Sequence, residues 1–130
     1  REFGAQEDFD QGYGVSFTTG ANNSYELFID GDNNGLYAAE GTDGFLSLYT
    51  LSNNNFIGDF CTTRNSVTSC AADGDITKLD ITFVRPDPEA VIKINDIEGT
   101  TYENAEIILE SPRGATTSVI VNSTGQLSAQ

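Results

Sequence analysis

Short apolar runs alternate with turn residues along almost the whole chain. Residues 24–29 and 79–83 carry apolar side chains at every second position, the period of a strand with one buried face. Gly, Asn, Asp and Pro bound these runs and favour turns. We therefore expect short strands at residues 13–18, 24–29, 36–37, 45–51, 56–60, 79–83, 90–94, 105–109, 118–122 and 126–128.

This spacing of strands predicts an all-β fold. Many short strands joined by turns are typical of an antiparallel sandwich of two sheets. Pro86 and Pro88 exclude a helix interior or a central strand at that point. Only residues 1–10 permit a helix, so we interpret them as the remnant of an N-terminal helix or as a linker. Without a repeat or an internal linker, residues 11–130 form a single β-rich globular domain.

Composition excludes several classes of function. The chain has 130 residues, with 20 acidic and 6 basic side chains, a net charge of −14 and no His. Without His, neither a Ser-His-Asp nor a Cys-His nucleophile can form, and no pair of carboxylates stands out, so we expect no enzyme. Six cations cannot neutralise a run of phosphates, and none follows Arg113, so we expect no nucleic-acid partner. No apolar run is long enough to cross a bilayer.

The two cysteines, Cys61 and Cys70, lie in a region rich in Asn, Ser and Thr. Their short separation fits a disulfide that closes a small loop in an oxidising compartment. The alternative is a pair of reduced, buried thiols. Zinc is not expected, because there is no His to complete a ligand set.

One segment matches the first half of a calcium loop. Asp30, Asp32 and Asn34 place oxygen ligands at alternate positions, and Leu36 offers its carbonyl oxygen. The twelfth position is Gly41, where a calcium loop has a bidentate Glu. The alternative is a polar hairpin turn whose side chains accept local backbone hydrogen bonds. Calcium is the one cofactor that the sequence suggests.

Two further charged groups have plain structural interpretations. Asp73, Asp75 and Asp80 form a second acidic cluster, which we expect to be a turn and a solvated strand face rather than a metal site. Arg85 precedes two prolines, and we expect it to form a salt bridge with an acidic neighbour rather than to bind a ligand.

Several local patterns, in order, resemble one bacterial family. The most specific is Phe83-Val84-Arg85-Pro86-Asp87-Pro88, which is similar to a Phe-x-Arg-Pro-Asp-Pro segment of the type IV pilin-like proteins. The similarity is closest to the H-type minor pseudopilins and spans essentially the whole chain. The segments that carry it are residues 1–3, 12–17, 24–37, 81–90, 107–111 and 119–127.

The resemblance implies a structural role. Members of this family carry a leader cut by a prepilin peptidase, then a hydrophobic helix about one membrane span long. That helix anchors the subunit in the inner membrane and later packs in the filament core, while the β-domain forms the filament surface. The chain is thus expected to be the headgroup of a minor pilin or pseudopilin, lacking its N-terminal helix. Complete, it would have the α+β pilin fold.

The same resemblance sets the expected partners and location. The partners are other pilin or pseudopilin subunits, met through the missing helix, and the inner membrane before assembly. The location is extracytoplasmic, first at the inner membrane and then in a cell-surface or periplasmic filament, either type IV pilus-like or type II secretion-like. The alternative function is a calcium-dependent adhesin or carbohydrate-binding β-sandwich module, an analogy based on fold alone.

Overall fold

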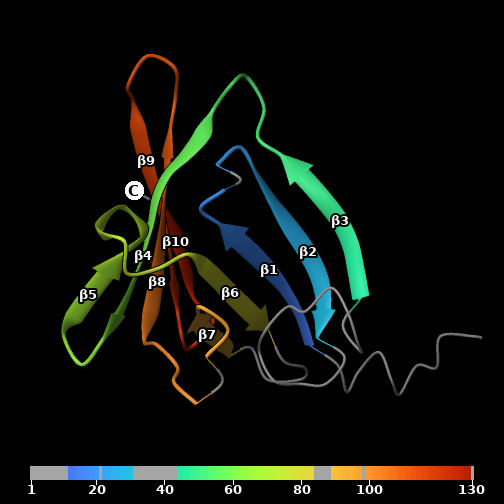
Figure 1. The fold of residues 1–130 in the computed structure, drawn as a ribbon, viewed down its shortest axis with the longest axis vertical. Coiled ribbons are helices and arrows are strands. Elements are labelled where there is room, and N and C mark those ends of the chain that lie inside the picture. The colour runs from blue at the N-terminus through green and yellow to red at the C-terminus, as the bar shows by residue number, and fades with distance from the viewer. Residues whose placement is uncertain (1–11, 21, 31–43, 84–88, 98, 130) are drawn as a thin grey trace, which may run out of the picture.

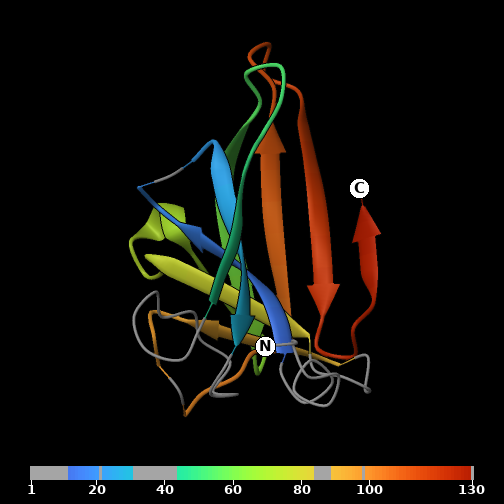
Figure 2. The same cartoon turned by 90° about the vertical axis from the view of Figure 1, so that its right-hand side faces the viewer.

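The computed structural model describes residues 12–20, 22–30, 44–83, 89–97 and 99–129. Within these ranges, ten strands form two antiparallel five-stranded sheets (Figure 1; Figure 2). One 3₁₀ turn is also present. The predicted all-β class and two-sheet arrangement are confirmed. A helix long and apolar enough to cross a membrane is not found in the described part of the chain.

The first sheet has the strand order β3-β2-β1-β6-β7. Val15 on the central strand lies opposite Leu27 on one side and Ile81 on the other, so apolar residues of three strands share one face. The strands are β1 (Gly12–Thr18), β2 (Ser24–Asp30), β3 (Gly44–Thr50), β6 (Lys78–Phe83) and β7 (Ala90–Ile94).

The second sheet has the strand order β10-β9-β8-β4-β5. Its pairing aligns Phe60, Ile107 and Val119 across three strands on the face toward the first sheet. The strands are β4 (Phe56–Arg64), β5 (Val67–Cys70), β8 (Asn104–Glu110), β9 (Thr116–Asn122) and β10 (Leu127–Ala129), and the 3₁₀ turn η1 (Ala71–Asp73) follows β5.

The core lies between the facing sides of the two sheets. Full burial of one such Ile, Leu or Phe side chain contributes about 1.5–3 kcal/mol. The rings of Phe17 and Phe60, 6.2 Å apart, join the sheets near β4. The buried core residues are Phe17, Ile57, Phe60, Ile76, Leu79, Ile81, Ala90, Ile92, Ile94, Ala105, Ile107 and Val121.

The segment between the cysteines differs from the prediction. The sequence indicated a strand at 56–60 followed by a loop, but β4 continues to Arg64 and returns as β5. Asn65 and Ser66 make the turn with φ of 54° and 68°. Two successive left-handed residues form the tight turn that suits the twist of a hairpin. Because these residues are not glycines, the turn signal in the sequence was weak.

Part of the outer face of the first sheet is also buried, contrary to expectation. Asp80 was expected on a solvated strand face, and this is wrong: its side chain is 0% exposed. Phe28 and Thr82 on the same face are equally buried. Lys78 lies 3.3 Å from the Asp80 carboxylate and offsets part of the cost of burying that charge. The predicted strand at 36–37, the proline break and Arg85 lie outside the described residues.

Candidate functional site

The candidate calcium ligands lie at the limit of the described structure. Asp30 ends the backbone of β2, and nothing is described of its side chain; Asp32, Asn34 and Leu36 fall outside the described residues. The calcium loop therefore stays a prediction. Where side chains are described, one acidic and cysteine group is compact enough to hold a metal ion: Asp59 with Cys61 and Cys70.

The two cysteines of that group are joined to each other. Cys61 and Cys70 lie directly opposite in the β4–β5 pair, with an S–S distance of 2.05 Å, so the predicted disulfide is confirmed. Because both sulfur atoms are used in this bond, neither can supply the thiolate that a metal site requires. This group is therefore a disulfide that joins the two strands of the hairpin rather than a metal centre.

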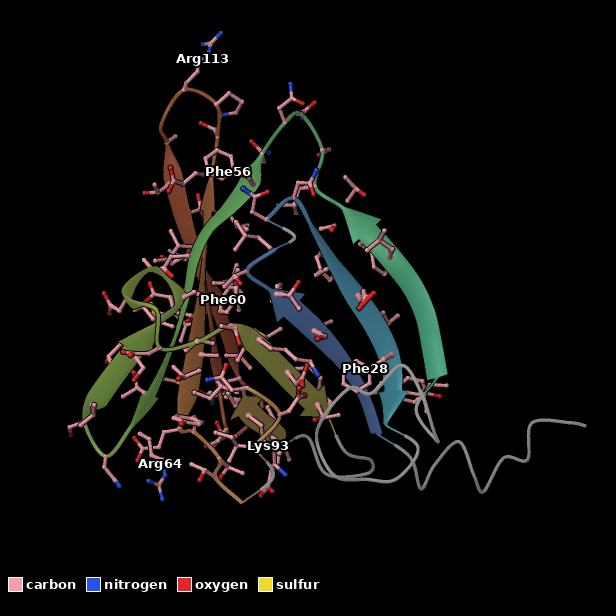
Figure 3. The ribbon with its side chains drawn as sticks, in the orientation of Figure 1. Phe28, Phe56, Phe60, Arg64, Lys93 and Arg113 are labelled. Carbon is pink, nitrogen blue, oxygen red and sulfur yellow. A yellow bond between two sulfur atoms is a disulfide. The ribbon has the colours of Figure 1, made fainter. Side chains whose placement is uncertain are left out.

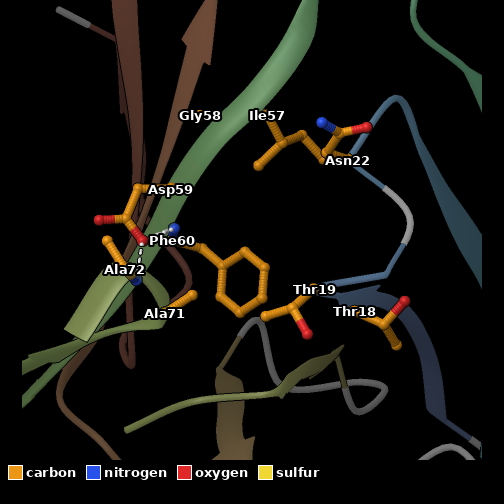
Figure 4. A pocket seen from close by; sticks show the side chains of 9 residues that line it. All are labelled: Thr18, Thr19, Asn22, Ile57, Gly58, Asp59, Phe60, Ala71 and Ala72. Carbon is orange, nitrogen blue, oxygen red and sulfur yellow. Dashed lines mark hydrogen bonds between the residues drawn. The ribbon is translucent and has the colours of Figure 1, made fainter. Parts of the chain in front are cut away.

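Asp59 holds η1 against β4 beside a small hollow of about 240 Å³ (Figure 4). Its Oδ1 accepts hydrogen bonds from the backbone N–H of Phe60, at 2.8 Å, and of Ala72, at 2.9 Å. This carboxylate caps two local donors, and Thr18, Thr19 and Asn22 complete a polar rim on the far side. The arrangement explains how η1 is fixed against β4.

An apolar groove lies between the two sheets. It has a volume of about 410 Å³. The first sheet contributes Val15, Phe17, Tyr25, Ile81 and Phe83, the second contributes Ile57, Ile107, Leu109, Val119, Val121 and Leu127, and Leu51 lies between β3 and β4. We call this feature the inter-sheet groove. Twelve lining residues without a charged side chain are unusual in a chain of net charge −14.

The inter-sheet groove exists because the sheets diverge away from β4. Near β4 they are held together by the contact of Phe17 with Phe60 and by the Ile57 N–H, which donates to the Asn22 carbonyl at 2.6 Å. In Figure 2, β9 and β10 extend to the right of the strands of the first sheet. The inner face of β10 is therefore open, and Leu127 is 65% exposed.

Aromatic rings line the first-sheet side of the inter-sheet groove. The ring of Tyr25 lies 5.6 Å from that of Phe17 and 5.4 Å from that of Tyr49, where the rings are stacked. Tyr49 is 45% exposed, so the row runs from the core to the surface. A second hollow of about 340 Å³ continues the groove, and shares Leu51 and Leu109 with it. Its other lining residues are mostly polar and include Glu110, so the apolar surface ends where the second hollow begins.

The main charged cluster with described side chains lies outside the inter-sheet groove. Lys78 Nζ donates to Asp96 and lies 3.3 Å from Asp80. Burial of the Lys78 ammonium lowers its pKa, but the hydrogen bond to Asp96 and the negative charges of both aspartates outweigh burial, so the pKa of Lys78 is raised above its ordinary value. The cluster joins β6 to the turn after β7 and is structural.

This raised pKa predicts an alkaline limit to stability. Because the folded-state pKa of Lys78 exceeds that of the unfolded chain, the cluster's contribution is complete below about pH 10.4 and is lost as the pH rises through the raised value. We expect Lys78→Met to lower the free energy of unfolding by about 1–2 kcal/mol at pH 8. In urea unfolding experiments, the difference in free energy of unfolding between wild type and Lys78→Met should become smaller above about pH 10.4.

The control is Arg64→Met, which removes an exposed cation that is not part of the Lys78 cluster. The difference in free energy of unfolding between Arg64→Met and wild type should stay constant from about pH 8 to above about pH 10.4. If the difference in free energy of unfolding between Lys78→Met and wild type were equally constant over this pH range, it would contradict the raised pKa of Lys78.

Comparisons with models of protein families, with curated proteins and with solved structures find no match to this chain. The inter-sheet groove is thus the candidate site on its geometry alone. Sequence reasoning did not identify it, although Tyr25 and Leu127 had been placed in predicted strands.

Proposed function

We propose that the chain is the headgroup of a structural subunit, a minor pilin or pseudopilin of a type IV pilus-like or type II secretion-like filament. The observation that carries the proposal is the inter-sheet groove, an apolar hollow that reaches the surface at the exposed Leu127, on a domain that is otherwise rich in acidic side chains. It supports the proposal because such surfaces on soluble domains mark the contact site of another apolar element. Because the sequence resembles pilin-like proteins, we infer that this element is an upstream helix.

An upstream apolar helix would pack on this domain as a further layer of secondary structure. An α-helix with its side chains is about 10–12 Å across, and packed layers of secondary structure lie about 10 Å apart. An apolar helix laid along the inter-sheet groove would cover Val119 and Leu127 from one side and Tyr25 from the other. Covering them would remove the exposed apolar surface from water, which is favourable by about 25 cal/mol per Å².

The charge of the domain fits the outside of a filament. A net charge of −14 keeps the headgroup solvated and disfavours non-specific association. Under this proposal the helix supplies contacts to neighbouring subunits and the anchor in the inner membrane, and the β-domain faces the extracytoplasmic medium. The disulfide is consistent with that oxidising location.

The test compares this chain with a longer form that also includes the segment encoded upstream of Arg1. Under this proposal, that segment begins with a short basic leader, which about twenty apolar residues follow. The chain contains no Trp, so Leu127→Trp introduces a single fluorescent reporter into the inter-sheet groove. In the longer chain, in detergent, we expect its emission to shift to shorter wavelength than in the present chain, because the helix covers the ring.

Leu48→Trp is the matched control. Leu48 is 57% exposed, close to the 65% of Leu127, and does not line the inter-sheet groove. Its emission should be the same in both chains, which separates a helix contact from a detergent effect. Equal emission of Leu127→Trp in the two chains, or a gene without the apolar segment, would refute the proposal and leave the adhesin or carbohydrate-binding module as the alternative.

A further inference from the structure

The disulfide of the β4–β5 hairpin has a carboxylate beside it. Asp59 Oδ2 lies 3.9 Å from Cys61 Sγ. A carboxylate oxygen of Asp59 and the sulfur atoms of Cys61 and Cys70 all lie within 4.8 Å of one another. Asp59 and Cys61 are two positions apart on β4, so their side chains leave the strand on the same face. A negative charge therefore adjoins both sulfur atoms.

The carboxylate of Asp59 is held in this position by its other oxygen. Oδ1 accepts the backbone N–H of Phe60 at 2.8 Å and the backbone N–H of Ala72 at 2.9 Å (Figure 4). One donor belongs to β4 and the other to η1, which directly follows Cys70. Because the two bonds fix the orientation of the carboxylate, Oδ2 stays next to the disulfide.

No cation neutralises the charge of Asp59. Among the side chains that the structure describes, no Lys or Arg forms an ion pair with it. The only cation of the β4–β5 hairpin is Arg64, which lies at the far end of the hairpin from Phe60 (Figure 3). Glu106 lies directly opposite Cys61 in the β4–β8 pair and adds a second carboxylate to the same face. The surroundings of the disulfide are therefore negative.

The two sulfur atoms differ in their access to a reductant. Cys61 is 6% exposed, whereas Cys70 is partly exposed. In thiol–disulfide exchange a thiolate attacks one sulfur atom and the other leaves as a thiolate. The accessible target is Cys70, so Cys61 is the leaving group. Its negative charge develops beside Asp59 Oδ2, and like charges at this separation repel.

We propose that Asp59 protects the Cys61–Cys70 disulfide kinetically against reduction by thiols. With a dithiol reductant, one thiolate attacks Cys70 Sγ, the S–S bond breaks and Cys61 leaves with the electron pair. The second thiolate of the reductant then attacks its own sulfur in the mixed disulfide and releases Cys70. Both cysteines take up a proton, and the reductant becomes a cyclic disulfide. Asp59 opposes the first step, because it repels the incoming thiolate and disfavours the departing one.

The test is the rate at which dithiothreitol opens the disulfide of the folded chain at pH 8, with free thiols trapped by iodoacetamide and counted by mass. Asp59→Asn removes the charge but keeps an oxygen that accepts both backbone N–H groups. We expect it to be reduced about tenfold faster than wild type. Its urea unfolding curve without reductant should match that of wild type, because the contacts of η1 are kept.

Asp73→Asn is the matched control. It removes the same charge from η1, and Asp73 is exposed and is not part of the group around the disulfide. It should be reduced at the wild-type rate. A rate for Asp59→Asn equal to that of wild type, or an equal acceleration by Asp73→Asn, would overturn the proposal.

The charge of the attacking thiol separates repulsion from a loosened hairpin. A looser hairpin would be opened faster by every thiol in the same proportion. Repulsion by Asp59 predicts that the ratio of the Asp59→Asn rate to the wild-type rate is larger for the anionic thiol mercaptopropionate than for the cationic thiol cysteamine. Equal ratios for the two thiols would contradict the protective role. The assay uses the present chain and does not depend on the upstream helix.

Discussion

Gly14→Ala is expected to destabilise the fold by about 3 kcal/mol, the upper part of the range for overpacking a buried site. A Cβ atom at Gly14 would lie 2.6 Å from the carbonyl oxygen of Ile81 and 2.7 Å from the ring of Phe28. Neither neighbour can move easily, because one is backbone of the adjacent strand and the other is a ring with 0% exposure. Urea unfolding followed by circular dichroism measures the loss.

Gly20→Ala is the control for the general effect of adding a methyl group to a glycine. No atom lies within 4 Å of a Cβ built at Gly20, so its free energy of unfolding should change by less than about 0.5 kcal/mol. Phe28→Leu combined with Gly14→Ala should cost less than the sum of the two changes, because the smaller side chain relieves one of the two clashes. Equal stability of Gly14→Ala and Gly20→Ala would contradict the packing described for β1.

The role of Gly14 shows what the strand pattern predicts and what it leaves open. Alternation correctly placed Tyr25 and Leu27 on one face of β2 and Phe28 on the other. It did not show that both faces are buried, since period-two alternation distinguishes the two sides without saying what covers each. Asp80 was therefore assigned to the wrong environment. That Gly14 faces Phe28 follows from the β1–β2 register, which a strand pattern does not fix.

The inter-sheet groove was beyond prediction for a related reason. Its residues have the composition and spacing of core residues, and Val121 and Leu127 differ only in what lies opposite them. Val121 is 5% exposed and Leu127, its partner across β9 and β10, is 65% exposed. The difference arises from the angle and offset between two sheets, a property of tertiary packing. The disulfide was predictable because it depends only on two residues and a short separation.

Cys61→Ala with Cys70→Ala is the second change with a large expected effect. The disulfide spans a separation of nine residues and removes chain entropy from the unfolded state, which corresponds to about 2–3 kcal/mol. β5 has four residues and is paired only with β4 among the described strands, so it depends on this bond more than a central strand would. We expect lower stability in urea and faster amide exchange of β5 than of β8.

The next pair on the same face of the hairpin is the control for the loss of a cross-strand contact without a covalent bond. The hydroxyls of Thr63 and Thr68 lie 3.0 Å apart in an exposed position, so Thr63→Ala with Thr68→Ala should cost no more than about 1 kcal/mol. Adding reductant should lower the stability of wild type and of the threonine variant alike, and leave the cysteine variant unchanged. If the cysteine variant proved as stable as the threonine variant, the disulfide would not be what holds β5 in place, and the turn at Asn65 and Ser66 would suffice.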